Sequence, residues 1–202
     1  MSAEEQNKIL TSLHGRLIGL NHEHKLVVKN GYIINGTPKA ILEFDSEGIA
    51  VESLAAYGQF CSTQNQVPVS NDTPVLVTHN VQDTIFGMTQ SVGAGFTMQT
   101  AGRYQILAGA QIAKASGSAL RTLAMWLRKN DEDVPRSAVE NGITSLDTTV
   151  LLLNYCVDLA AGDNIKIYMA TPDVTGSIGL YVGSRTNVPV IPAIMTSIFK
   201  IR

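Results

Sequence analysis

Residues 102–113 read GRYQILAGAQIA, and from Tyr104 to Ile112 an apolar side chain or alanine stands at every second position. A period of two is typical of a strand that turns one face toward a core. The intervening positions include the polar residues Arg103, Gln105 and Gln111. The stretch therefore predicts a long β-strand over Gly102–Ala113 with one buried face.

Residues 148–159 read TTVLLLNYCVDL and predict a second long strand that is apolar on both sides. One face carries Leu151, Leu153, Tyr155, Val157 and Leu159, and the other carries Val150, Leu152, Asn154 and Cys156. A strand of this kind needs cover on both faces. We expect a second sheet to cover one face and a neighbouring subunit to cover the other.

The rest of the chain from Ala56 onward repeats the pattern of strand, turn and strand. Further strands are expected at Tyr57–Ser62, Pro74–Val77, Gly95–Gln99, Thr122–Lys129, Asn164–Ala170, Gly179–Val182 and Ala193–Ile201. Turn residues separate them, including Asn141-Gly142, Ala161-Gly162-Asp163 and the acidic run Asp131-Glu132-Asp133. So many short strands without an amphipathic helix indicate an all-β fold, an antiparallel jelly-roll β-sandwich over residues 56–202.

The first 55 residues have a different character, and we interpret residues 1–55 as an attachment or docking segment. Ser2 and Glu5 form a capping box for a short helix over about Ala3–His14. Its apolar face, with helical spacing, consists of Ile9, Leu10, Leu13 and Leu17. Hairpins are expected at Asn30-Gly31 and Asn35-Gly36 because Asn-Gly favours type I′ turns. Neither a three-turn helix nor a small β-meander can bury its own apolar side chains, which include Ile33 and Ile34.

Composition argues against several classes of function. The formal net charge is -2, so the basic excess that nucleic-acid binding needs is missing. No apolar run approaches the roughly 18 residues of a membrane span, and the acidic start is unlike a signal peptide. Cys61 and Cys156 are expected to be free, buried thiols. No catalytic motif is found, so we expect no enzyme, no cofactor and no metal, with His22-Glu23-His24 and the acidic run read as solvated loops.

Three segments resemble a known superfamily. Residues 96–106 read FTMQTAGRYQI, residues 157–167 read VDLAAGDNIKI, and Leu127-Arg128-Lys129-Asn130 lies between them. These are similar to the signatures of the complement globular-head and tumour-necrosis-factor-like jelly-roll superfamily. Gln99 stands where the family has proline, and the last strand lacks the family's aromatic ending. These departures favour a distant branch, such as the trimeric jelly rolls of viruses and bacteriophages.

The resemblance implies a homotrimer and a structural role. We expect a virion protein made in the host cytoplasm: a trimeric phage head fibre, spike or capsid decoration protein docked on capsid or other virion proteins. The alternative is a receptor- or glycan-binding adhesin or tail-tip head, whose partner is a host-surface glycan. Four residues are expected in the core or the trimer interface: Tyr104, Trp126, Leu152 and Tyr155. A low charged fraction of 16 %, against about 25 % in typical domains, also hints at oligomerisation.

Overall fold

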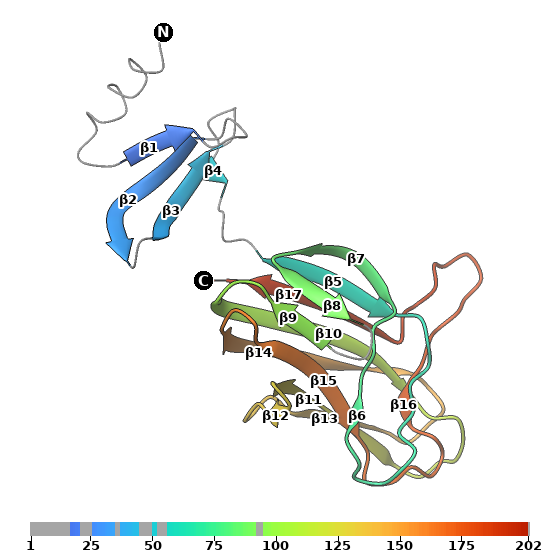
Figure 1. Ribbon diagram of the computed structural model, residues 1–202. Coiled ribbons are helices and arrows are strands. Elements are labelled where there is room, and N and C mark those ends of the chain that lie inside the picture. Colours follow the sequence, from blue (N-terminus) through green and yellow to red (C-terminus); the bar gives the residue numbers. More distant parts are fainter. Residues whose placement is uncertain are drawn as a thin grey trace. The chain divides into compact units, whose positions relative to one another are not determined.

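In the computed structural model the chain divides into two units, Met1–Ala55 and Ala56–Arg202 (Figure 1). The structure describes residues 17–20, 26–34, 37–44, 50–51, 56–91 and 95–201. The expected helix over about Ala3–His14, with Ile9, Leu10 and Leu13, lies outside these ranges.

The first unit contains a four-stranded antiparallel sheet in the order β1-β2-β3-β4. Its strands are β1 (Leu17–Leu20), β2 (Leu26–Ile34), β3 (Thr37–Phe44) and β4 (Ala50–Val51). The predicted hairpin at Asn30-Gly31 is wrong: both residues lie inside β2, where the register against β3 shifts between Lys29 and Ile33. A glycine and a neighbour that tolerates positive φ suit a bulge as well as a turn.

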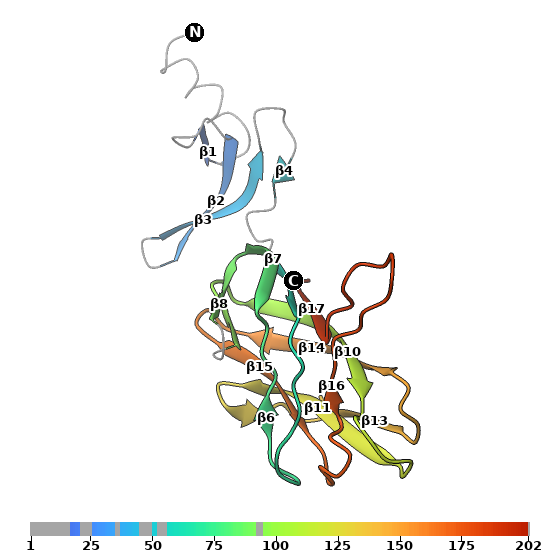
Figure 2. The same cartoon turned by 90° about the vertical axis from the view of Figure 1, so that its right-hand side faces the viewer.

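The second unit is a sandwich of two antiparallel sheets (Figures 1 and 2). The six-stranded sheet follows the order β14 (Thr149–Leu159), β10 (Gly102–Ala113), β17 (Ile194–Lys200), β5 (Tyr57–Ser62) and β7 (Val81–Phe86), with β16 (Gly179–Leu180) also paired to β10. The seven-stranded sheet follows β12 (Glu132–Asp133), β11 (Arg121–Lys129), β15 (Asn164–Ala170), β9 (Gly95–Met98) and β8 (Met88–Ser91). Here β13 (Val139–Ile143) pairs with β11, and β6 (Val75–Leu76) with β15.

The strand order confirms the jelly roll. Its eight principal strands in chain order are β5, β9, β10, β11, β13, β14, β15 and β17. Numbered one to eight, they make one sheet in the order 6-3-8-1 and the other in the order 5-4-7-2. In this arrangement successive strands lie in alternate sheets, except strands 4 and 5, which are neighbours in one sheet; this is the jelly-roll connection of two Greek keys.

The core lies between the sheets and contains the side chains that the alternation in residues 102–113 predicted. Tyr104, Ile106, Ala108, Ala110 and Ile112 are all buried. Leu151 and Leu153 of β14 join them, together with Leu123, Met125 and Leu127 of β11. The Tyr104 hydroxyl donates to the carbonyl of Thr100 at 2.7 Å, so the ring is buried without leaving its polar end unpaired.

Several elements of the sandwich differ from the sequence prediction. Asn141-Gly142 does not turn the chain but lies inside β13, where Gly142 pairs with Thr122. Space explains the glycine, because a Cβ there would lie 2.9 Å from a Leu120 methyl group. The strands β7, β8, β12 and β13 were not predicted. In β7 three of the six residues are polar and stand next to one another, so its alternation is weak, and β12 lies in the acidic run that was expected to be a turn.

The motif residues form one interlocked turn region. Asp163 pairs with Lys129 Nζ at 2.7 Å and accepts hydrogen bonds from the Ala160 backbone and the Asn130 amide, each at 2.7 Å. The Lys129 contact first, then the bonds from Ala160 and Asn130, lower the pKa of the Asp163 carboxyl to about 2. Asn130 in turn accepts from the Asn164 backbone at 2.8 Å. These residues therefore tie the end of β11 to the start of β15.

Replacing Asp163 by alanine is expected to lower the free energy of unfolding by about 1–2 kcal/mol, because three partners lose their acceptor. The folded pKa lies below the unfolded value near 3.8, so this stabilisation is complete above about pH 4 and is lost as pH falls toward 2. Urea denaturation at pH 7 and in acid measures both effects. Asp158→Ala, which breaks only the exposed pair with Arg103, is the control and should change stability much less.

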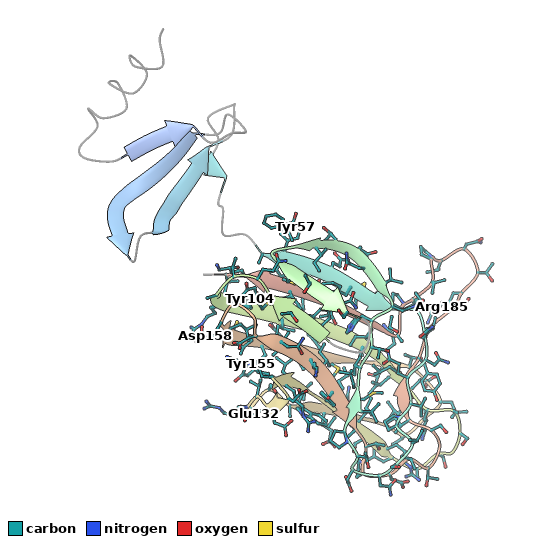
Figure 3. All side chains as sticks on the ribbon, in the orientation of Figure 1. Tyr57, Tyr104, Glu132, Tyr155, Asp158 and Arg185 are labelled. Carbon is teal, nitrogen blue, oxygen red and sulfur yellow. The ribbon has the colours of Figure 1, made fainter. Side chains whose placement is uncertain are left out.

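The sandwich has two ends that matter below. At the proximal end the chain enters at Ala56, whose carbonyl accepts from the Lys200 backbone at 2.7 Å, beside the last strand. At the distal end β17 begins, and the connection 183–191 before it stands out from the sandwich (Figures 1 and 2). The seven residues of β17 separate these ends by roughly 20 Å. Figure 3 shows Tyr57, Tyr104 and Asp158 toward the first end and Arg185 toward the second.

Candidate functional site

The candidate site is the outer face of the six-stranded sheet, where the strand register lines up two rows of mostly apolar side chains. The first row, nearer the proximal end, runs Cys156, Gln105, Phe199, Tyr57 and Phe86. The second row runs Leu152, Gly109, Met195, Cys61 and Val81. A mixed row that includes Asn154, Leu107 and Gln59 lies between them.

Several of these side chains are exposed in the single chain, although Cys61 is buried. Leu152 is 56 % exposed, Phe86 54 %, Met195 51 % and Phe199 45 %. Tyr57 stacks on Phe86 with ring centroids 5.9 Å apart, so the edge of the sheet is aromatic. An antiparallel sheet normally turns polar side chains to water on its outer face. A sheet face that exposes this many large apolar side chains is typical of an interaction surface.

Gly109 makes a hollow in the second row, between Leu152 of β14 and Met195 of β17. A Cβ built on Gly109 meets no other atom within 4 Å. A glycine in the middle of a central strand weakens that strand and often marks a place where another chain approaches closely. No described residue crowds the position of a Cβ here. A side chain of another subunit that enters the hollow would explain why this position is glycine.

The outer face of the seven-stranded sheet is different, because its charges pair with one another. Trp126 donates to Asp133 at 2.7 Å, and Arg128 pairs with the same carboxylate at 2.6 Å. The Arg128 guanidinium also lies 4.3 Å from the centre of the Tyr168 ring. Lys166 pairs with Asp131 at 2.6 Å. This face is therefore internally satisfied and offers little unpartnered apolar surface.

The four residues predicted for the core or the trimer interface lie in different parts of the sandwich. Tyr104 is fully buried, and Tyr155 packs against the core from β14 while its hydroxyl donates to the carbonyl of Pro135 at 2.9 Å. Leu152 lies on the apolar outer face. Trp126 is half-buried on the other outer face, outside the core, because it shares strand parity with Arg128 rather than with Leu127.

The docking residues lie in the first unit. Leu17 belongs to β1 and therefore does not continue the helical face expected for Ile9, Leu10 and Leu13. Ile33 and Ile34 lie on β2, where they pair with Pro38 and Thr37 of β3. Sequence reasoning missed Tyr57, Phe86, Met195 and Phe199 as members of the outer face. In residues 194–199, the parity of the larger side chains already separates Met195 from Ile194 and Ile198.

Other candidate chemistry finds little support in the described residues. Within the described ranges no three His, Cys, Asp or Glu side chains gather as a metal site, and His22-Glu23-His24 lies outside these ranges. Asp131 and Asp133 of the acidic run are held by Lys166 and Arg128. Both cysteines are free, but only Cys61 is buried as expected, since Cys156 is exposed on the outer face. Across the part of the chain that the structure describes, no helix is long and apolar enough to cross a membrane.

Comparison with known proteins yields a structural likeness alone. No protein-family model and no curated protein matches the sequence. Among solved structures, the crystal structure of murine APRIL at pH 5.0 is similar with a TM-score of 0.47 and 8 % sequence identity, over 73 % of this chain and 99 % of that one. The jelly roll is assigned from the strand order above, and nothing about function follows from this likeness.

Proposed function

We propose that the protein is a structural component of a virion, a homotrimeric head fibre, spike or decoration protein without catalytic activity. The apolar outer face of the six-stranded sheet carries this proposal, because it supplies the surface through which copies associate. The proposal of three subunits rests on the motifs at residues 96–106 and 157–167, which resemble those of trimeric jelly rolls.

A second copy of the chain is the occupant that best fits this face. The face holds both projecting side chains, such as Leu152 and Met195, and the hollow at Gly109, so copies can complement one another. The charges of Arg103 and Asp158 on this face offset each other, because the two side chains pair at 2.7 Å. Stable interfaces have apolar centres depleted of charge, as this face has.

Residues 1–55 are proposed to dock the trimer on capsid or other virion proteins. They form a unit of their own, Met1–Ala55, separate from the compact unit Ala56–Arg202. Three linked copies also multiply weak docking contacts.

Deletion tests the docking role. A fragment of residues 56–202 is expected to keep the mass of a trimer and the melting temperature of the full chain, but to be absent from virions assembled in its presence. Immunogold labelling of purified particles with antibodies against the sandwich gives the readout, with the full chain as control. Unfolding of the fragment would show that the first unit belongs to the core, and unlabelled particles with the full chain would refute the virion role.

The second candidate function is a glycan-binding head, exposed at the tip of an adhesin or tail. A polar cavity at the distal end favours it. This function is compatible with trimerisation, and a glycan array on the purified protein distinguishes it from a purely structural role.

A further inference from the structure

A cavity of about 190 Å3 lies at the distal end, at the base of the projecting connection 183–191. It is formed where β10, the start of β14 and the chain after β16 meet. Its lining is Gln111, Thr148, Tyr181, Val182, Gly183, Ser184, Arg185 and Ile191. At about 30 Å3 for each water, the cavity holds about six waters, or one small polar ring. Drug-sized ligands need about 300–1,000 Å3, so it fits one unit of a larger molecule.

The backbone around the cavity is well fixed. Gly183 and Ile191 exchange two backbone hydrogen bonds, at 2.9 and 3.0 Å, which close the base of the connection. The Tyr181 backbone N–H donates to the backbone carbonyl of Gln111 at 2.9 Å, and the Tyr181 hydroxyl donates to the carbonyl of Ser177 at 2.6 Å. At the tip, the Val188 backbone donates to the carbonyl of Arg185. The cavity is therefore largely formed before any ligand arrives.

The polar side chains of the lining keep their hydrogen-bonding capacity. Within residues 56–91 and 95–201, no hydrogen bond or ion pair engages the side chains of Gln111, Thr148, Ser184 or Arg185. Arg103, Arg121 and Arg128 all pair with aspartates, whereas Arg185, like the exposed Arg136, has no ion-pair partner among the described residues. Figure 3 shows Arg185 at the end of the sandwich from which the connection projects.

Together these side chains suit a ligand that carries both an anionic group and hydroxyl groups. Arginine binds a carboxylate through two parallel hydrogen bonds, and no lining residue is acidic. An amide and two hydroxyls suit the hydroxyl groups of a sugar, and the ring of Tyr181 offers an apolar wall. We propose that the cavity binds a carboxylate-bearing sugar unit, the terminal acidic residue of a surface glycan. This specifies the ligand of the second candidate function and does not depend on attachment to a virion.

The test titrates the full-length protein with N-acetylneuraminic acid and with glucuronic acid, and follows backbone amide shifts by NMR. Shifts confined to residues 111, 148 and 181–191, saturating in the millimolar range, are expected for at least one of the acids. Galactose tests binding of a sugar without a charge, and inorganic phosphate tests binding of a charge without a sugar. Arg185→Gln is expected to weaken binding about tenfold or more, and Arg185→Lys to restore only part of it.

Arg136→Gln is the matched control, since it removes the same charge from an exposed arginine outside the cavity and should leave binding unchanged. Three results overturn the proposal: no saturable shift with either acid, equal weakening by Arg136→Gln and Arg185→Gln, or phosphate binding as tightly as the acidic sugars. A negative result here leaves the labelling of particles unaffected, so failure of the cavity and failure of the virion role are distinguishable.

Discussion

Replacing Gly109 by arginine is expected to convert the protein from near three times the chain mass of 21.7 kDa to a monomer, with its fold intact. The isolated sheet accommodates the side chain because a Cβ at this position meets nothing within 4 Å. In an assembly through the outer face, the same side chain fills the hollow and brings three like charges together. Unpaired or like charges in an interface cost several kcal/mol, about 3 kcal/mol or more for each subunit.

Light scattering at micromolar concentration measures the mass, and circular dichroism checks that the strands remain. Thr89→Arg is the matched control, because it places the same charge on an exposed position of β8 in the other sheet and should leave the mass unchanged. If Gly109→Arg keeps the oligomer, the outer face is not the interface. If the unaltered protein is already a monomer, the trimer itself is refuted.

Acidification from pH 7 to pH 4 is expected to remove about 3 kcal/mol from the free energy of unfolding through one side chain, His79. The imidazole is 4 % exposed and lies near Phe60 and Phe96, with ring centroids 6.5 and 5.2 Å away. Its hydrogen-bond partner is the Thr196 hydroxyl, at 2.8 Å. Burial lowers the pKa of His79 from 6.5 to about 4, because the charged ring would lose its hydration.

The direction of the effect follows from where the proton binds. Between pH 6.5 and about 4, the unfolded chain binds a proton at His79 that the folded chain does not, so stability falls as pH falls. The contribution is complete above pH 6.5, and about 3 kcal/mol of it is lost by pH 4, where the folded chain itself is half protonated at His79.

Urea denaturation at several pH values and fixed protein concentration measures this loss. His79→Gln should be less stable at pH 7 but should lose much less stability between pH 6.5 and 4, while the three other histidines remain in both proteins and cancel. Equal slopes for the two proteins would contradict the assignment. Asp163 acts below about pH 4 and does not interfere.

The long strands could be predicted because their local pattern agrees with their final environment. Gly102–Ala113 has the predicted bounds, and Asn164–Ala170 does as well. The dipeptide Asn-Gly gave a wrong turn prediction twice. At residues 30–31 it lies at an irregularity of the β2–β3 register, and at residues 141–142 the glycine occupies a crowded strand position where a Cβ would meet Leu120. Trp126 was expected in the core or the trimer interface because it lies beside apolar residues in an alternating strand, whereas its parity with Arg128 places it on the outer face of the seven-stranded sheet.

The candidate sites were less predictable because distant segments build them. The two outer-face rows become visible once the register of β14, β10, β17 and β5 is known. The cavity joins residues 111, 148 and 181–191, which share no motif. Gly109 carried a signal that was missed: it interrupts an otherwise alternating strand, and no described residue crowds the position that its Cβ would take.

The hydrogen bond between Ala56 and Lys200 has a practical consequence for labelling and display. Since the sandwich begins and ends at one end, a fluorescent protein fused after the last strand would emerge beside the point where the first unit joins, and would crowd whatever that unit binds. A label meant for the opposite tip belongs within residues 186–190, where exposed backbone between the paired Gly183 and Ile191 can accept an insertion. The same closeness of ends makes the sandwich suitable for grafting into a loop of another protein.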